Sequence, residues 1–165
     1  MDYFKFCPKC AHRLIEKEAH GRKRLVCSKC SFIFYQNPKP TVGVFILEGE
    51  KVLLAKRAVE PFKGWWDSIG GFMEIGESPQ ETALREAKEE TGLGIELIEI
   101  LGATKDSYDS EHIVPISFIG KIVSGVPKPA DDVEELGWFS LGKLPKNIAF
   151  ECNKKALTLL KSRLS

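Results

Sequence analysis

Three glutamates at helical spacing form the most chemically suggestive group in the sequence. Glu86, Glu89 and Glu90 stand at positions i, i+3 and i+4, which share one face of a helix. Carboxylates this close repel one another unless a cation neutralises them, and hard oxygen ligands favour Mg²⁺ or Mn²⁺ over softer metals. The alternative interpretation of the same spacing is a solvated acidic helix face.

The segment around these glutamates carries signals for both ends of a helix. Ser78 is a favoured N-cap, Pro79 suits the first helical position, and Glu81 completes a capping box. At the other end, Gly92 supplies a stop. The sequence therefore predicts a helix over residues 78–91 with the three glutamates on one face.

A longer pattern contains this helix. It runs from Gly71, through Glu77 after five residues, to Arg85, Glu86, Ala87, Lys88, Glu89, Glu90, Thr91, Gly92 and Leu93 after seven more. This pattern resembles the signature of the Nudix hydrolase superfamily at every specified position. Three further segments are similar to their counterparts in Nudix hydrolases, namely Pro40–Arg57, Gly64–Gly76 and Asp131–Pro145.

The resemblance implies an α/β protein, an α/β/α sandwich around a mixed sheet, that hydrolyses phosphoric anhydride bonds with the help of Mg²⁺ or Mn²⁺. The metal ligands that it implies are Gly70, through its carbonyl, with Glu86, Glu89 and Glu90. It also implies that Arg85 orients a carboxylate, with Glu77 as its other partner. Glu89 is the first candidate for a ligand that also acts as the general base.

A second acidic group precedes Trp138. Several Nudix enzymes take an additional ligand or base from such a position, which makes Asp132 and Glu135 the candidates here. An ordinary acidic turn is an equal alternative. Candidates for substrate contact are Trp65, Phe72 and Arg57, which flank the expected active loop or end a nearby strand.

One departure from the family pattern precedes the glycine pair. Nudix proteins usually carry Leu-Pro there, whereas this chain has Ser68-Ile69. The missing proline removes a fixed φ angle and restores an N–H donor. The resemblance therefore fixes the geometry around Gly70 less firmly than the rest of the site.

Two Cys-x-x-Cys pairs lie near the N-terminus. Cys7 with Cys10, and Cys27 with Cys30, are separated by sixteen residues, which is typical of a tetrahedral four-thiolate zinc site. Zinc would supply folding free energy that such a short segment lacks. Because four thiolates complete the coordination shell, we expect a structural Zn²⁺.

The chain divides into a zinc ribbon (residues 1–36) and a Nudix domain (37–165), with a proline-bearing linker over residues 37–40. Strands are expected over residues 41–47, 51–57, 65–69, 95–103, 112–123 and 136–140, with an amphipathic closing helix over 147–164. A hairpin turn is expected at Glu48-Gly49-Glu50, between the first two of these strands.

The composition of the chain indicates the cellular compartment in which the protein acts. No apolar stretch approaches the ~20 residues that a membrane-spanning helix needs, and the hexapeptide Met1–Phe6 lacks the features of a secretory signal. Free cysteines in this pattern favour a reducing compartment, so we expect a cytoplasmic protein.

Charge is unevenly distributed. Residues 1–40 hold nine Lys/Arg and three Asp/Glu, a net charge of +6, whereas the remainder holds fifteen and twenty, a net charge of −5. We interpret the basic segment as a solvated surface and do not expect nucleic acid as a partner. A nucleic-acid enzyme or binder that uses the basic ribbon remains an alternative, as does a nucleotide-sensing regulator without catalysis. Whether the chain forms a homodimer is left open.

A ribbon joined to this domain resembles the zinc-ribbon branch of Nudix hydrolases, which includes pyrophosphatases of FAD, ADP-ribose and NADH. The Ser-Gln-Pro-Trp-Pro-Phe motif of the NADH-cleaving enzymes is absent from Ile95–Ser107. ADP-ribose enzymes often carry a proline where this chain has Tyr108-Asp109. The chain as a whole is most similar to the FAD and ADP-ribose type, so a small nucleoside diphosphate derivative is the expected substrate.

Overall fold

The structure, a computed structural model, describes residues 4–164 and consists of two compact units that meet between Asn37 and Pro38. The first three residues of the hexapeptide considered for a secretory signal lie outside the described part. Within residues 4–164, no helix is long and apolar enough to cross a membrane.

The smaller unit is a three-stranded antiparallel sheet with two matching cysteine turns. Its strands, in the order β1-β2-β3, are β1 (Leu14–Ala19), β2 (Arg22–Cys27) and β3 (Ile33–Phe34). After each cysteine pair the chain turns through a residue with positive φ, Ala11 or Ser31. The N–H of Ala11 donates to the Cys7 carbonyl, and that of Ser31 to the Cys27 carbonyl, so the two turns have the same hydrogen-bonding pattern.

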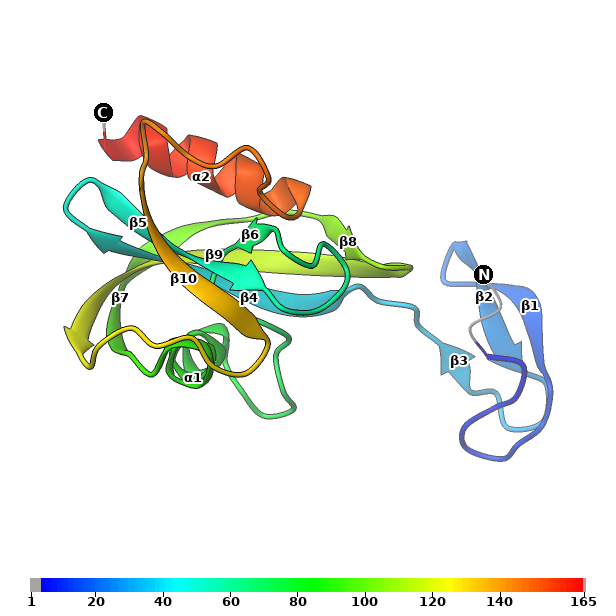
Figure 1. The fold of residues 1–165 in the computed structure, drawn as a ribbon. Coiled ribbons are helices and arrows are strands. Elements are labelled where there is room, and N and C mark those ends of the chain that lie inside the picture. The colour runs from blue at the N-terminus through cyan, green and yellow to red at the C-terminus, as the bar shows by residue number, and fades with distance from the viewer. Residues whose placement is uncertain (1–3, 165) are drawn as a thin grey trace. The chain divides into compact units, whose positions relative to one another are not determined.

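The larger unit is built on a mixed sheet (Figure 1). Its elements are β4 (Lys39–Glu48), β5 (Lys51–Arg57), β6 (Trp66–Asp67), α1 (Pro79–Thr91), β7 (Gly94–Ala103), β8 (Asp106–Tyr108), β9 (Glu111–Ser124), β10 (Val133–Ser140) and α2 (Glu151–Leu164). The strand order is β10-β5-β4-β9-β7, with β6 paired to β5 and β8 to β9. Only the β4–β9 pairing among these strands is parallel.

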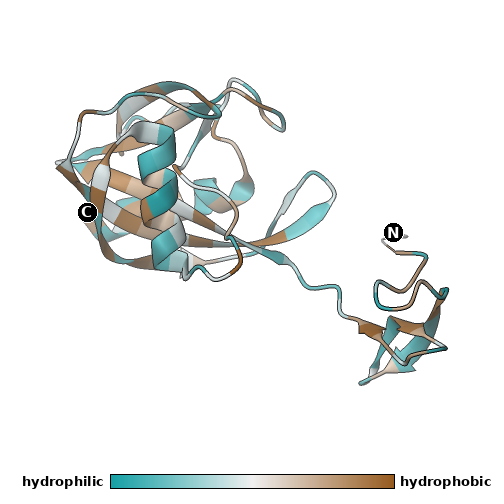
Figure 2. Ribbon diagram, turned by 90° about the horizontal axis from the view of Figure 1, so that it is seen from below, coloured by the Kyte–Doolittle hydropathy of each residue, from teal (hydrophilic) through white to brown (hydrophobic). Residues whose placement is uncertain are grey.

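Both faces of this sheet are buried, one beneath each helix (Figure 1). On β4, Val44 and Ile46 pack with Ala83 and Ala87 of α1, whereas Phe45 points to the opposite face. That face is covered by α2, through residues that include Ala156, Leu157 and Leu160. Burial on both sides explains why the central strands are continuous apolar runs, drawn largely in brown in Figure 2. The α/β/α sandwich expected from the sequence is confirmed.

The elements expected from sequence are present, with shifted ends. The turn between β4 and β5 is confirmed, because Glu48 pairs with Lys51. The strand expected over residues 65–69 is reduced to β6, and β8 was not expected. The strands expected to begin at 112 and 136 begin earlier, at Glu111 and Val133.

The closing helix begins at Glu151, so the prediction of helix over residues 147–150 is wrong. These residues pair with β6 instead. The N–H of Trp66 donates to the Asn147 carbonyl at 2.9 Å, and that of Ala149 to the Trp66 carbonyl at 2.7 Å. A tertiary backbone pairing has therefore taken the place of the helix's first turn.

Candidate active site

Helix α1 has the termini that its sequence predicts. Ser78 is the N-cap, its side chain accepts from the N–H of Glu81, and Glu81 bonds back to the Ser78 backbone. Gly92 ends the helix with a φ of 71° and donates to the Lys88 carbonyl at 3.0 Å. These contacts fix the register of α1, and with it the direction in which each glutamate points.

The three helix glutamates occupy different environments. Glu86 and Glu90 are buried against the sheet, with 8% and 6% of their surface exposed. The Glu89 side chain is 48% exposed. Two of the expected ligands therefore face the interior of the domain, and the third faces solvent.

The glycine pair lies directly against the buried glutamates. The N–H of Gly70 donates to Oε2 of Glu90 at 3.0 Å. Gly70 has a φ of +150°, and a Cβ there would lie 2.0 Å from the Val42 carbonyl oxygen. A Cβ on Gly71 would lie 2.5 Å from Oε1 of Glu86. Gly70 thus requires glycine, because the backbone of Val42 approaches too closely for any side chain, whereas a side chain at Gly71 would displace the Glu86 carboxylate.

Arg85 connects three carboxylates, one from the loop before α1 and two from α1 itself. Its Nε donates to Oε1 of Glu77 at 2.6 Å, and its Nη1 donates to Glu86 at 2.8 Å and Glu89 at 2.9 Å. Its Nη2 also reaches the Phe72 carbonyl, at 3.2 Å. The Arg85 side chain thus ties α1 to the loop that precedes it and orients two of the candidate ligands.

The charges of the buried carboxylates are only partly balanced. Burial raises the pKa of Glu90 well above its ordinary value, and the neighbouring charges of Asp132 and Glu86 raise it further. Burial also raises the pKa of Glu86, against the opposing effect of Arg85. Among the described residues, neither Glu90 nor Asp132 takes part in an ion pair. Glu90 is therefore a buried acid without a counter-charge, beside the half-buried Asp132, and such a group fits a ligand of a divalent cation.

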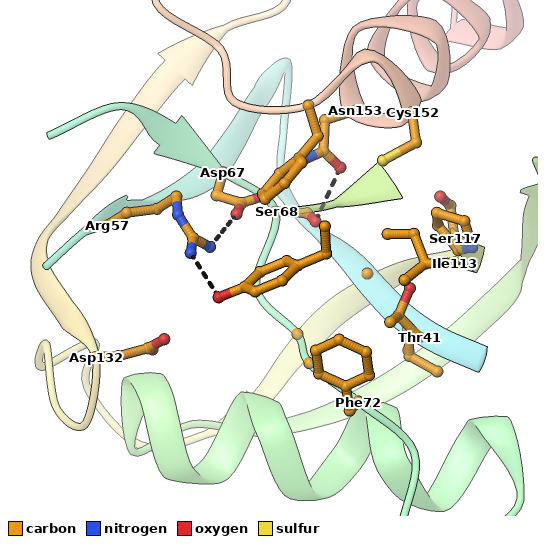
Figure 3. A pocket seen from close by; sticks show the side chains of 17 residues that line it. Thr41, Arg57, Asp67, Ser68, Phe72, Ile113, Ser117, Asp132, Cys152 and Asn153 are labelled. Carbon is orange, nitrogen blue, oxygen red and sulfur yellow. Dashed lines mark hydrogen bonds and ion pairs between the residues drawn. The ribbon is translucent and has the colours of Figure 1, made fainter. Parts of the chain in front are cut away.

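The two candidates of the second acidic group lie in different places. Asp132 lines the same cleft as Gly70 and Gly71, and Figure 3 shows it above α1. Glu135 is not brought to this cluster. Its carboxylate pairs with Lys56 at 3.5 Å, and its side chain is 58% exposed. The two positions lie on opposite sides of the irregularity between Val133 and Glu135, where β10 shifts its register against β5.

A cleft opens beside the glycine pair (Figure 3). It encloses about 650 Å³ of space, including the part open to solvent. Three aromatic rings line it. The ring centroids of Phe72 and Tyr108 lie 5.5 Å apart, and those of Tyr108 and Phe150 lie 5.7 Å apart in a stacked arrangement. The cleft therefore offers flat apolar surface next to the acidic cluster of Glu86, Glu90 and Asp132.

Of the three residues that the sequence suggested for substrate contact, two line the cleft and one does not. Phe72 and Arg57 line the cleft. The Arg57 guanidinium is already engaged, because it donates to Asp67 at 2.8 Å, to the Pro61 carbonyl at 2.7 Å and to Oη of Tyr108 at 3.3 Å. Trp65 is not among the lining residues; its ring packs against Phe62 at 5.4 Å.

A buried polar network at the back of the cleft was missed in the sequence. Asn153 of α2 donates to Oδ1 of Asp67, and Oγ of Ser68 donates to Oδ1 of Asn153 at 3.0 Å (Figure 3). Burial raises the pKa of Asp67 to about 6, although Arg57 and Asn153 lower it. One signal could have revealed Asn153, namely a polar residue on the otherwise apolar face of the closing helix. Tyr108 and Phe150 carried no such signal.

The four N-terminal cysteines converge in the smaller unit. Their Sγ atoms all lie within 4.8 Å of one another, and three pairs are 3.5 Å apart. Ligands around a tetrahedral Zn²⁺ with bonds of ~2.3 Å are separated by about 3.8 Å. Backbone N–H groups of Lys9 and Cys30 point at Sγ of Cys7 and Cys27, and such bonds favour thiolates. The cluster thus has the donor set and spacing of a structural zinc site.

Comparison with known proteins agrees with this geometry. Residues 37–160 match the family model of the NUDIX domain, and residues 5–36 match the zinc-ribbon model described as Nudix N-terminal. The chain belongs to the Nudix family. The Nudix crystal structure from Nitrosomonas europaea, titled a NUDIX hydrolase, superposes with a TM-score of 0.82 at 33% identity, covering 93% of this chain and 88% of that one.

Two Nudix relatives carry names that state an activity. An ADP-ribose pyrophosphatase from Methanocaldococcus jannaschii is 39% identical over 122 residues, which is 73% of this chain and 72% of that protein. An NAD-capped RNA hydrolase NudC from Pseudomonas aeruginosa is 32% identical over 143 residues, 86% of this chain. The chain spans only 49% of that relative's length. The name of the second relative gives that protein an RNA substrate, whereas nucleic acid was expected to be an unlikely partner of this chain.

Proposed function

We propose that this Nudix hydrolase cleaves the pyrophosphate linkage of a nucleoside diphosphate derivative with the help of Mg²⁺ or Mn²⁺. The observation that carries the proposal is the set of buried, partly unbalanced carboxylates on α1, packed against the glycine pair at the mouth of an aromatic cleft. A catalytically silent regulator would have no need to keep these acids at the cost of their burial.

The residues proposed to hold the cation are the three helix glutamates and the Gly70 carbonyl, with Asp132 as a further ligand in preference to Glu135. Asp132 lies close enough to raise the pKa of Glu90, whereas Glu135 is paired with Lys56. When bound, the cation would neutralise the pyrophosphate oxygens and lower the pKa of an attacking water.

The chain's own residues would divide the remaining tasks. Arg85, braced by Glu77, fixes the positions of Glu86 and Glu89. Glu89 is the solvent-facing member of the cluster, so water has access to its carboxylate, and it is our candidate for accepting the proton of the attacking water.

The cleft supports a nucleotide-type substrate. A base or similar ring can lie against Phe72, Tyr108 and Phe150, while its phosphates extend toward the glutamates. ADP-ribose and FAD are the foremost candidates and NADH a lesser one, in line with the name of the archaeal relative.

We further propose that Zn²⁺ occupies the four-cysteine cluster and that the protein works in the cytoplasm. All five cysteines are free thiols. Four clustered thiols keep their metal most readily where disulfides do not form.

The test is a screen of ADP-ribose, FAD, NADH and NAD-capped RNA with added Mg²⁺, followed by Glu89→Gln. We expect one of the small nucleotides to be cleaved, and the variant to lose about 100-fold or more in kcat. Glu96→Gln is the matched control, because Glu96 is an exposed residue of β7 paired with Lys121. Unchanged turnover in Glu89→Gln would contradict the assigned role, and no Mg²⁺-dependent cleavage of any compound would contradict the function.

A further inference from the structure

The strand register of the smaller unit sorts its side chains onto two faces. Residues directly opposite in an antiparallel pair point to the same side, and successive residues alternate. Leu14 pairs with Cys27, and so lies on the same side of the sheet as the four-cysteine cluster. Lys17 pairs with Arg24, and because this pair is an odd number of positions from the pair of Leu14 and Cys27, its side chains point to the opposite side. The opposite side, called here the outer face, carries Ile15, Lys17, Ala19, Arg22, Arg24, Val26 and Ile33.

The acidic residues of the hairpin all lie on the cysteine side. Glu16 pairs with Leu25, and Glu18 pairs with Lys23, both in phase with Leu14. Lys23 also forms an ion pair with Glu16 at 3.2 Å. Leu14 and Leu25 pack with the cysteines on this side. The cysteine side is therefore covered by apolar packing, and its strands carry two acids and one cation.

The outer face has a different composition. It carries three cations and no acid among its strand residues. The side chains of Val26 and Ile33 belong to none of the hydrophobic clusters of the described residues, and Ile15 is 38% exposed. The outer face thus holds three of the nine cations of residues 1–40, and they surround a small apolar centre.

An aromatic ring completes this face. Tyr35 follows β3, and 47% of its surface is exposed. The guanidinium carbon of Arg24 lies 4.6 Å from the centre of its ring, and the His20 ring lies 6.3 Å away in a stacked arrangement. A flat ring is therefore held in place beside cations instead of being buried in a core.

We propose that the outer face binds a single-stranded polynucleotide. Lys17, Arg22 and Arg24 would contact its phosphates, and Tyr35 would stack on one base. A sheet face that presents cations around an exposed aromatic ring has the chemistry that holds unpaired strands, because every base offers a flat face for stacking. An acidic protein surface would use the cations but would gain little from the exposed ring.

This binding is independent of the proposed hydrolysis, since it uses none of the residues of the cleft or of α1. It is measured with the full-length, zinc-loaded chain and a fluorescein-labelled 12-nucleotide RNA of mixed sequence, by anisotropy without added divalent cation. Three phosphate contacts predict a salt slope of about −2 for a single strand, so affinity should fall roughly 20-fold between 50 and 200 mM KCl.

Two variants locate the site. Lys17→Ala/Arg22→Ala removes two exposed cations from the outer face and should reduce the salt slope to about −0.7. Tyr35→Leu should weaken binding about tenfold with an unchanged slope, because it removes stacking alone. The matched control is Lys9→Ala/Lys23→Ala, which makes the same charge change on the cysteine side, where Lys9 lies over Phe32. Zinc content confirms that each variant keeps its fold.

Three results would overturn the proposal. One is the absence of RNA binding at 50 mM KCl. A second is equal weakening by the control and the outer-face variant, which would reveal a non-specific charge effect. The third is RNA binding insensitive to both outer-face variants while Lys17→Ala/Arg22→Ala changes the mass in sedimentation, which would make the face a contact between copies of this chain.

Discussion

At the scale of single residues, Asn153 holds the segment that precedes the glycine pair. Ser68 occupies the position at which Nudix proteins commonly have leucine, and no proline stiffens the chain before Gly70. Asn153 reaches this segment from α2, bonding to Ser68 and Asp67, while its N–H₂ also donates to the Ala149 carbonyl at 3.2 Å. The loop that carries the proposed carbonyl ligand is therefore held by a side chain 85 residues away in sequence from Ser68.

Replacing Asn153 with alanine tests this role. The change removes one of the two side-chain partners of the buried Asp67, which keeps Arg57, and removes the acceptor of the Ser68 hydroxyl, so we expect a loss of about 1–3 kcal/mol in the free energy of unfolding, measured by urea denaturation. Because the Gly70 loop would be less fixed, the Mg²⁺ concentration for half-maximal activity should rise more than the KM for the nucleotide. Thr158→Ala is the control on an exposed part of α2. Equal Mg²⁺ requirements in variant and wild type would argue against a positioning role.

Glu77 predicts a specific acid response. Hydrogen bonds from Arg85 lower the pKa of Glu77 to about 2 from its ordinary 4.5. A lowered pKa contributes stability at pH values above 4.5, and this contribution disappears as the pH falls through 2. Glu77→Gln should therefore be less stable than wild type at pH 7 and approach it between pH 4.5 and 2, in urea denaturation at several pH values. A stability difference that stays constant over that range would contradict the assignment.

At the scale of elements, α1 is positioned by its ends as much as by its apolar face. The capping box at Ser78, the proline that follows it and the Gly92 terminus leave little freedom in where the helix starts and stops. Since Glu86 and Glu90 project from this helix toward the glycine pair, any shift of its start would move them away from the loop.

Removal of the N-cap should therefore affect stability first. Ser78→Ala is expected to cost about 1 kcal/mol in the free energy of unfolding, because the side-chain acceptor for the Glu81 N–H is lost. Ser78→Asp should retain most of the stability, since a carboxylate can also cap. Thermal or urea denaturation of the three proteins decides the matter, and an Ala variant as stable as the Asp variant would show that the cap contributes nothing.

At the scale of the whole molecule, the two units are stabilised by different means. The larger unit has extensive cores on both faces of its sheet, whereas the smaller one has a single small cluster around its cysteines. All three tryptophans lie in the larger unit, at positions 65, 66 and 138. Their fluorescence reports on that unit alone.

Zinc removal should accordingly act on one unit. A strong chelator, or Cys10→Ser, should make the N-terminal segment up to Asn37 sensitive to limited proteolysis, because metal binding supplies its folding free energy. The urea midpoint read by tryptophan fluorescence should change little. A large shift of that midpoint would show that the larger unit depends on the zinc-bound ribbon.

The sequence alone determined the features that depend on local order. The sequence predicted the capped helix, the glutamate spacing and the two cysteine pairs, because each of these features depends on residues that are close together in the chain. The sandwich with a sheet buried on both faces followed from the resemblance to the Nudix family, which rests on the same local motif.

Only the tertiary structure decided the features that depend on distant contacts. Pairing with β6 shortened the closing helix to begin at Glu151, and a register shift in β10 separated Asp132 from Glu135. The network of Asn153, Asp67 and Arg57 joins three elements across the sheet. Spacing along the chain cannot reveal such contacts, because they arise from packing among segments that are far apart in sequence.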